Sequence, residues 1–153
     1  MKQRLFLLVL LAAVFGGCNR DENFTVRHNF PDRTWYRFNT LQFEVPVEQS
    51  ENPVNIVFFA SIGKDYPFDS LAFNMVMKTP SGEERVKECS MDVKDRNGQF
   101  KAAFTGDSCE MTYILRREVI FDRSGTLTIE LENLVPRMRT TGLNGVGIRL
   151  QKP

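Results

Sequence analysis

The side chains that most often carry chemistry are few in this sequence of 153 residues. His28 is the only histidine, so neither a Ser–His–acid triad nor a metal site with several histidines can be assembled from the chain. The carboxylate pairs Glu83–Glu84 and Glu130–Glu132 show no sign of the burial that shifts a carboxyl pKa, so we expect them at solvent-facing strand positions. The sequence therefore predicts a protein that is not an enzyme, with no catalytic residue and no metal site.

Cys18 is the residue with the clearest chemical role, because it follows a segment with the parts of an export signal. Lys2 and Arg4 supply positive charge, residues 5–15 form an unbroken apolar run, and two glycines precede the cysteine. The apolar run is shorter than the roughly 20 residues that a membrane-spanning helix needs. The segment resembles a bacterial lipoprotein signal, in which a bulky apolar residue and two small residues precede a cysteine that becomes acylated.

We therefore expect residues 1–17 to be removed as a signal peptide and Cys18 to become the lipidated first residue. Its acyl chains would anchor the protein in a membrane at roughly 0.8 kcal/mol per buried methylene. This covalent lipid is the only cofactor that we expect. The alternative is a plain secretory signal that ends near a cysteine by chance.

The mature chain is predicted to be nearly neutral and to form one domain. Loss of residues 1–17 removes Lys2 and Arg4 and no acidic residue, which leaves 18 basic and 19 acidic residues. The two kinds of charge are interspersed, which excludes the basic surface expected of a nucleic-acid-binding protein. The remaining 136 residues are enough to bury a core without metals or many disulfides.

Two cysteines, Cys89 and Cys109, remain when Cys18 carries lipid. Outside the cytoplasm an even number of cysteines favours pairing. A bridge between these two would close a loop of about 20 residues and stabilise the fold by roughly 3 kcal/mol. The alternative is a pair of buried free thiols, because the sequence does not show whether the two residues come within bridging distance.

The elements that position these residues are predicted to be short strands. After a polar, lipidated tether at residues 18–29, apolar residues alternate with polar ones or form short runs that indicate strands. The expected strands lie within residues 41–47, 54–62, 71–77, 100–104, 111–115, 127–131 and 146–150. Turns are expected at Thr79–Gly82, at Asn97–Gly98 and at residues 122–125. This pattern predicts an all-β fold, an antiparallel β-sandwich of the jelly-roll kind, over residues 30–153.

Several short motifs are spread over most of the mature chain. They are Trp35 after Phe30-Pro31, Leu41-Gln42-Phe43-Glu44, Asp65-Tyr66-Pro67-Phe68 before Leu71, Pro80-Ser81-Gly82, Gly98, Gly125, Met138-Arg139 and the ending from Leu143 to Arg149. The most specific are the Tyr-Pro-aromatic turn and the Met-Arg pair that is followed by Gly-Val-Gly-hydrophobic-Arg. In these motifs the sequence resembles the gliding-motility lipoprotein GldH family.

The resemblance implies a β-sandwich lipoprotein that is anchored in the outer membrane. It also implies association with the machinery that moves surface adhesins in gliding bacteria, and no known catalytic activity. We accordingly expect protein partners in the cell envelope, with the domain facing either the periplasm or the cell surface.

Two segments are candidates for a partner-binding surface. Tyr66, Pro67 and Phe68 form a loop that could present an aromatic platform, or could fold its own aromatic rings back onto the sandwich. Arg137 and Arg139 follow a proline and are suited to recognising carboxylate or phosphate groups, although a solvated loop is the alternative.

A surface carbohydrate-binding module is the second functional interpretation. In that case Trp35, Tyr36, Tyr66 and Phe68 would stack on sugar rings. The two interpretations differ in one observable property. Exposure of these four aromatic side chains in one groove favours glycan binding, whereas their burial favours a role in protein assembly.

Overall fold

The computed structural model describes residues 24–153, and all of the pairing between strands in this range is antiparallel. Cys18 and the predicted signal peptide lie outside the described residues. The strands are β1 (Thr25–Asn29), β2 (Thr34–Tyr36), β3 (Leu41–Val47), β4 (Ser50–Gly63), β5 (Ser70–Lys78), β6 (Glu84–Asp92), β7 (Ser108–Phe121), β8 (Gly125–Asn133), β9 (Arg139–Thr141) and β10 (Leu143–Gln151).

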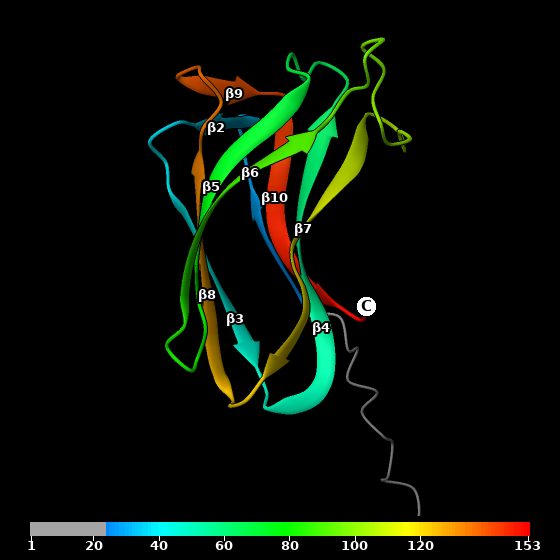
Figure 1. Ribbon diagram of the computed structural model, residues 1–153. Coiled ribbons are helices and arrows are strands. Elements are labelled where there is room, and N and C mark those ends of the chain that lie inside the picture. The colour runs from blue at the N-terminus through cyan, green and yellow to red at the C-terminus, as the bar shows by residue number, and fades with distance from the viewer. Residues whose placement is uncertain (1–23) are drawn as a thin grey trace, which may run out of the picture.

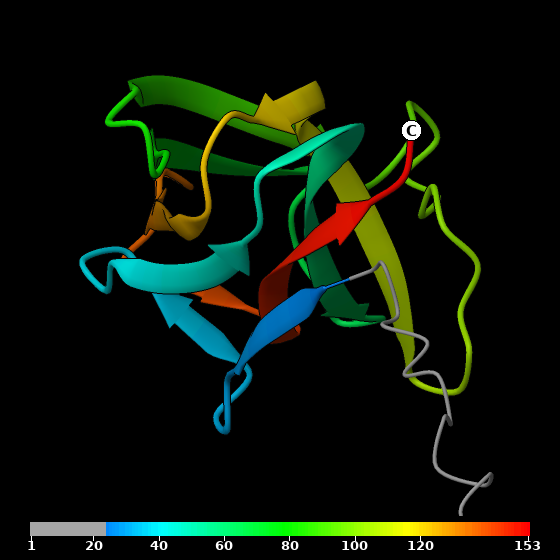
Figure 2. The same ribbon diagram turned by 90° about the horizontal axis from the view of Figure 1, so that it is seen from below.

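Two four-stranded sheets face each other and enclose the core. The first sheet has the strand order β1-β10-β4-β7 and the second has the order β3-β8-β5-β6 (Figure 1). The rings of Phe58 in the first sheet and Phe73 in the second meet at 4.4 Å between their centroids. At one side of the sandwich β1 contacts β3 (Figure 2). The predicted all-β, antiparallel sandwich is confirmed.

Alternation of apolar and polar residues explains most strands. In β3, Leu41, Phe43, Val45 and Val47 are buried, and the residues between them are exposed. In β4, by contrast, residues 55–63 are buried on both faces. The outward-facing ring of Phe59 is covered by the guanidinium of Arg149 at 4.8 Å, and it lies so close to Gly147 that no side chain would fit there.

The small ribbon β2-β9 closes one end of the sandwich (Figure 1). Its strands precede β3 and β10, so the ribbon lies where β10 begins. The chain enters the first sheet at the opposite end, since Thr25 pairs with Arg149 near the end of β10. The ribbon and the start of the described domain are thus separated by the length of a strand.

The turns between strands agree with the sequence predictions, whereas the start of the domain does not. The turns at Thr79–Gly82 and Asn97–Gly98 are confirmed, since Gly82 N donates to Thr79 O at 3.0 Å and Gly98 N donates to Asp95 O at 3.0 Å. The predicted tether at residues 18–29 is too long, because residues 25–29 form β1 and pair with β10. The sandwich therefore begins before residue 30.

The strand predicted at residues 100–104 is wrong. Phe100 takes part only in an isolated bridge to Lys94, and the residues that follow it form a loop. The alternation of Phe100 and Phe104 instead brings their two rings together at 5.0 Å. No residue range was predicted for the neighbouring strand β6, which follows the turn at Thr79–Gly82, because its residues from Glu84 to Glu88 are all exposed and show no apolar alternation.

Candidate docking surface

The ribbon β2-β9 is fixed to the sandwich through its inner face. Trp35 of β2 and Thr140 of β9 pair with each other and are completely buried. The side-chain amide of Asn133, at the end of β8, donates to the carbonyl of Trp35 at 2.9 Å and to Thr140 Oγ1 at 2.8 Å. Its oxygen accepts a hydrogen bond from Val135 N at 2.9 Å. Asn133 thus satisfies its polar groups inside the core and ties the ribbon to the second sheet.

The indole of Trp35 anchors the loop that follows β2. It stacks on Phe30 with a centroid separation of 6.1 Å, and its Nε1 donates to the carbonyl of Asn39 at 2.9 Å. A buried tryptophan needs such a partner for its N–H group. The buried indole therefore fixes the loop between Tyr36 and Leu41 from the side that faces the core.

A second set of contacts holds the other side of the ribbon. Arg33 adopts a positive φ of 54° before β2, and its Nε donates to Asn144 Oδ1 at 2.9 Å. Its NH2 group bonds Asp65 Oδ1 at 2.5 Å, which lowers the pKa of the Asp65 carboxyl. Both side chains are substantially exposed, so water screens this ion pair. The pair therefore orients the Arg33 side chain more than it stabilises the fold.

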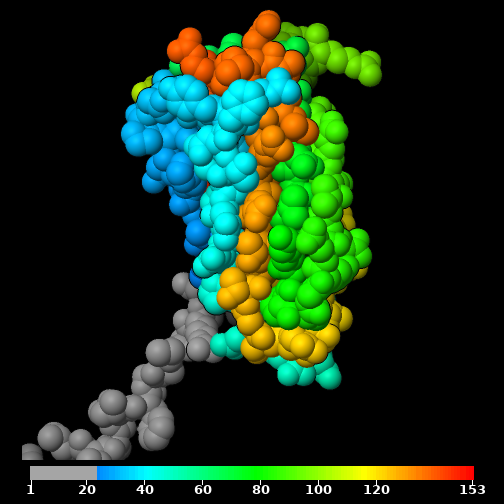
Figure 3. Space-filling model, turned by 90° about the vertical axis from the view of Figure 1, so that its left-hand side faces the viewer, coloured from blue at the N-terminus to red at the C-terminus, as the bar shows by residue number. Residues whose placement is uncertain are grey.

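The outer side of this rigid end carries apolar side chains in contact with water. The exposed fractions are 46% for Tyr36, 77% for Phe38 and 64% for Met138. Three of the five large exposed apolar residues of the described chain are therefore here. Arg37 N donates to Met138 O at 3.1 Å, which brings the loop after β2 against the segment before β9. Figure 3 shows these two segments, in cyan and orange, side by side at the upper end of the molecule.

Arginines frame the exposed apolar groups. Arg139 pairs with Tyr36 across the ribbon, and Arg137 lies in the exposed segment before β9. We call Tyr36, Phe38, Arg137, Met138 and Arg139 the ribbon platform. An apolar centre with arginines at its edge is typical of surfaces that bind other proteins.

Tyr36 is held in a defined position on the platform. Its hydroxyl donates to Asp32 Oδ2 at 2.9 Å. This hydrogen bond, together with the negative charge of Asp32, raises the pKa of the Tyr36 hydroxyl, and the nearby Arg139 opposes the shift. The tyrosine therefore remains protonated and keeps its ring fixed beside Arg139.

The sequence profile of the GldH lipoprotein family matches residues 22–150. The chain belongs to the GldH lipoprotein family. The match includes every strand of the sandwich except the last residue of β10, and it confirms the resemblance carried by the short motifs. No curated protein matches the sequence.

In this GldH-family chain the two candidate partner-binding segments behave differently. Arg137 and Arg139 are exposed, at the position where the sequence had suggested a recognition loop. Tyr66 is only 1% exposed, its hydroxyl donates to Ser70 O at 2.9 Å, and burial raises the pKa of this hydroxyl. Phe68 packs on the Tyr66 ring at 5.7 Å, so the loop turns its aromatic rings inward and leaves Pro67 exposed.

The four aromatic residues considered for sugar stacking do not form an exposed set. Trp35 and Tyr66 are buried in the core, Phe68 is partly buried, and Tyr36 alone among them stands well exposed on the ribbon platform. By the criterion of exposure, this arrangement favours protein binding over glycan binding. Phe38, the most exposed aromatic residue of the platform, was missed because nothing in its local sequence distinguishes it from a core residue.

Cys89 and Cys109 are buried free thiols in the structure. The predicted bridge between them is not formed, which agrees with the alternative that the sequence had left open. Cys89 lies on β6 and Cys109 on β7, which are edge strands of different sheets. Burial raises the pKa of both thiols, so they are poor nucleophiles at neutral pH.

The paired glutamates of the sequence lie at the surface of the sandwich. Glu130 and Glu132 lie on the outer face of β8, and Glu83 bonds two arginines. Among residues 24–153, no group of three or more His, Cys, Asp or Glu side chains is arranged to hold a metal ion. The same residues include no helix with the length and apolar character needed to span a bilayer.

Proposed function

We propose that this GldH-family lipoprotein is a non-catalytic component of a gliding-motility-type assembly in the cell envelope. It is anchored in the outer membrane by lipid on Cys18 and binds a protein partner through the ribbon platform. The observation that carries the proposal is the exposure of Tyr36, Phe38 and Met138 on a ribbon that buried hydrogen bonds hold rigid.

Rigidity matters because binding costs less when the surface is already ordered. The buried Asn133 and the Trp35 indole fix both segments that carry the platform. Aromatic and arginine side chains are also the residues most often found at the energetic centre of interfaces. The platform therefore combines suitable residue types with a fixed arrangement.

The position of the anchor supports the same function. Cys18 precedes Thr25 by seven residues, which limits their separation to about 25 Å even in a fully extended chain. Thr25 lies toward the end of the sandwich opposite the ribbon, because it pairs with Arg149, six residues or roughly 20 Å along β10 from Leu143. A lipid on Cys18 would therefore be attached to the domain near the end opposite the ribbon platform.

Two double variants test the proposal. Phe38→Ser with Met138→Ser removes the apolar centre, and Arg137→Glu with Arg139→Glu reverses the charged edge. Because these residues are exposed, each change should cost under about 0.5 kcal/mol, and Tm should stay within a degree or two. Both variants should fail to co-purify, after cross-linking in intact cells, with the envelope proteins that the unchanged protein captures, and should reduce colony spreading in a gliding host.

Matched controls use exposed residues outside the platform. Ile120→Ser removes an apolar side chain that is 59% exposed, and Arg117→Glu with Arg123→Glu reverses two exposed charges. Both controls should retain partner recovery. Unchanged partner recovery in the two platform variants would contradict the proposal, as would equal losses in the controls.

A further inference from the structure

A second surface lies where the two sheets end side by side. β6 is the edge strand of one sheet and β7 is the edge strand of the other. Between them is a hollow of about 300 Å³, which is at the lower end of the range of ligand pockets. A further hollow of about 390 Å³ lies between the same strands, near Met91 and Met111. We call the first hollow the seam groove.

The floor of the seam groove is apolar. It is formed by Met75 and Met77 of β5 and by Leu115 of β7. Val86 of β6 stands beside it with 64% of its surface exposed. Met75, Met77 and Leu115 are themselves buried in the core. The groove thus reaches the outer margin of the core, and Val86 is its most exposed apolar neighbour.

The rim of the groove is basic. Arg85 pairs with Met77 and Lys87 with Met75 in the β5-β6 register, so both cations lie beside the methionine floor. Arg116 of β7 completes the rim from the other sheet. Lys87 Nζ also lies 5.5 Å from the ring centroid of Tyr113, a cation–π contact that holds its ammonium group at the seam.

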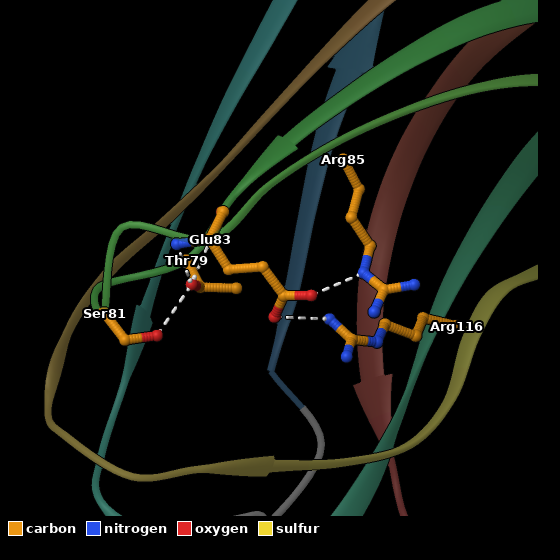
Figure 4. Close-up of polar contacts among 5 residues, drawn as sticks. All are labelled: Thr79, Ser81, Glu83, Arg85 and Arg116. Carbon is orange, nitrogen blue, oxygen red and sulfur yellow. Dashed lines mark hydrogen bonds and ion pairs between the residues drawn. The ribbon is translucent and has the colours of Figure 1, made fainter.

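One carboxylate of the chain already shows what this rim binds. Glu83 accepts a hydrogen bond from Arg85 Nε at 2.6 Å and another from Arg116 NH1 at 3.2 Å, as Figure 4 shows. These two bonds lower the pKa of Glu83 and keep it ionised. Two of the three rim cations contact Glu83 and Lys87 does not, so the three cations and this carboxylate together carry a formal charge of about +2 that favours further anionic groups.

Charge disfavours the symmetric pairing of two copies of the chain in the register centred on Val86. If two β6 strands paired antiparallel about Val86, Glu84 would lie opposite Glu88. Arg85 would then lie opposite Lys87 of the other copy. Like charges that face each other directly destabilise a strand pair. Charged residues on an edge strand likewise discourage pairing with uncharged strands.

We propose that the seam groove binds an extended, acidic segment of a partner polypeptide. The segment adds as a strand to the free edge of β6, with carboxylates on its inner face against Arg85 and Lys87. Apolar side chains on its other face lie beside Val86. Arg85 and Lys87 therefore disfavour pairing with uncharged or basic strands and favour an acidic one. The backbone of β6 supplies the hydrogen bonds of the strand pair.

The test uses the full lipidated protein in lipid nanodiscs and a fluorescent peptide of about eight residues that alternates glutamate and valine. Fluorescence anisotropy should show binding roughly tenfold tighter than for peptides that alternate glutamine or lysine with valine. Arg85→Gln with Lys87→Gln should weaken binding of the glutamate peptide by a similar factor. Glu83→Gln should strengthen it several-fold, because it removes a carboxylate that competes for the same arginines.

Controls separate the groove from general charge effects. Lys78→Gln removes an exposed cation on the outer face of the same sheet and should leave binding unchanged. Hydrogen exchange of the β6 amides should slow when the glutamate peptide binds. Equal affinity for the three peptides, or no change in β6 exchange, would overturn the proposal. Displacement of the peptide by octanoate together with failure of β6 exchange to slow would instead assign the groove to an anionic amphiphile.

Discussion

The side-chain amide of Asn133 donates a hydrogen bond of 2.9 Å to the backbone carbonyl of Trp35, which lies 98 positions earlier in the chain. Because the same amide also bonds Thr140 and Val135, one buried side chain joins the second sheet to both strands of the ribbon. The ribbon platform therefore depends on a residue that is itself inaccessible to any partner.

Asn133→Leu should lower the free energy of unfolding by about 2–4 kcal/mol. The substitution keeps a similar volume but deprives a buried carbonyl, a hydroxyl and an N–H group of a partner, and each unsatisfied group is costly. Urea denaturation would measure this loss of stability. The substitution should also increase the rate of amide hydrogen exchange more in β2 and β9 than in β4. The exposed Asn52→Ala variant should stay within about 0.5 kcal/mol of the unchanged protein. A comparable loss in both variants would contradict the assigned role.

Gly142→Ala should destabilise the domain far more than Gly98→Ala. Both glycines have a positive φ, 79° and 76°, so alanine carries a backbone strain of about 1–2 kcal/mol at either position. A Cβ at Gly142, however, would lie 2.8 Å from the Cα of Tyr66, whereas one at Gly98 would meet nothing within 4 Å. The difference between the two variants in urea denaturation isolates this contact. Equal losses would show that Tyr66 can move away from the ribbon at no cost.

The alternation of apolar residues predicted the strands of the core because each such strand has one buried face. In β3 and β5 the pattern of the sequence and the pattern of burial coincide. The pattern failed for β6, whose inward-facing Arg85 and Lys87 lie at the open seam between the sheets. It also failed for β1, whose polar residues pair with β10 through the backbone. Hydrogen bonds between backbone groups do not depend on side-chain polarity, so a strand held mainly by them shows no apolar alternation in the sequence.

The candidate surface was predictable only in part, for a similar reason. Arg137 and Arg139 stood out because arginines beside a proline suggest an exposed loop. Trp35 and Phe38 look alike in the sequence, yet the first is completely buried and the second is 77% exposed. Their environments are fixed by the ribbon, whose partner strand lies about a hundred residues away. The role of Asn133 depends on the same long-range contact.

Cys89 and Cys109 should remain unlinked and slow to react in the folded protein. Mass spectrometry of non-reduced peptides should recover both as thiols, and a reductant should leave Tm unchanged. Burial raises the pKa of both thiols in the folded state above their pKa in the unfolded chain. The contribution of the two protonated thiols to the stability of the fold is therefore complete at a pH below the unfolded-state pKa. It is lost as the pH rises through the folded-state pKa. The free energy of unfolding should therefore fall above about pH 8.5, and less steeply in Cys89→Ala. Recovery of a linked peptide would contradict this prediction.

Cys18→Ser should abolish the lipid anchor while leaving the sandwich intact. In the proposed maturation the thiol is modified before residues 1–17 are removed, and a serine hydroxyl cannot replace it. The variant should keep its signal peptide, fail to incorporate labelled fatty acid, and retain the Tm of the domain because residue 18 precedes the first strand by seven positions. Asn19→Ser is a matched control that changes the neighbouring residue and preserves the thiol. Fatty-acid labelling of the Cys18→Ser protein at the level of this control would contradict the lipid anchor, and with it the proposed attachment near the end opposite the ribbon platform.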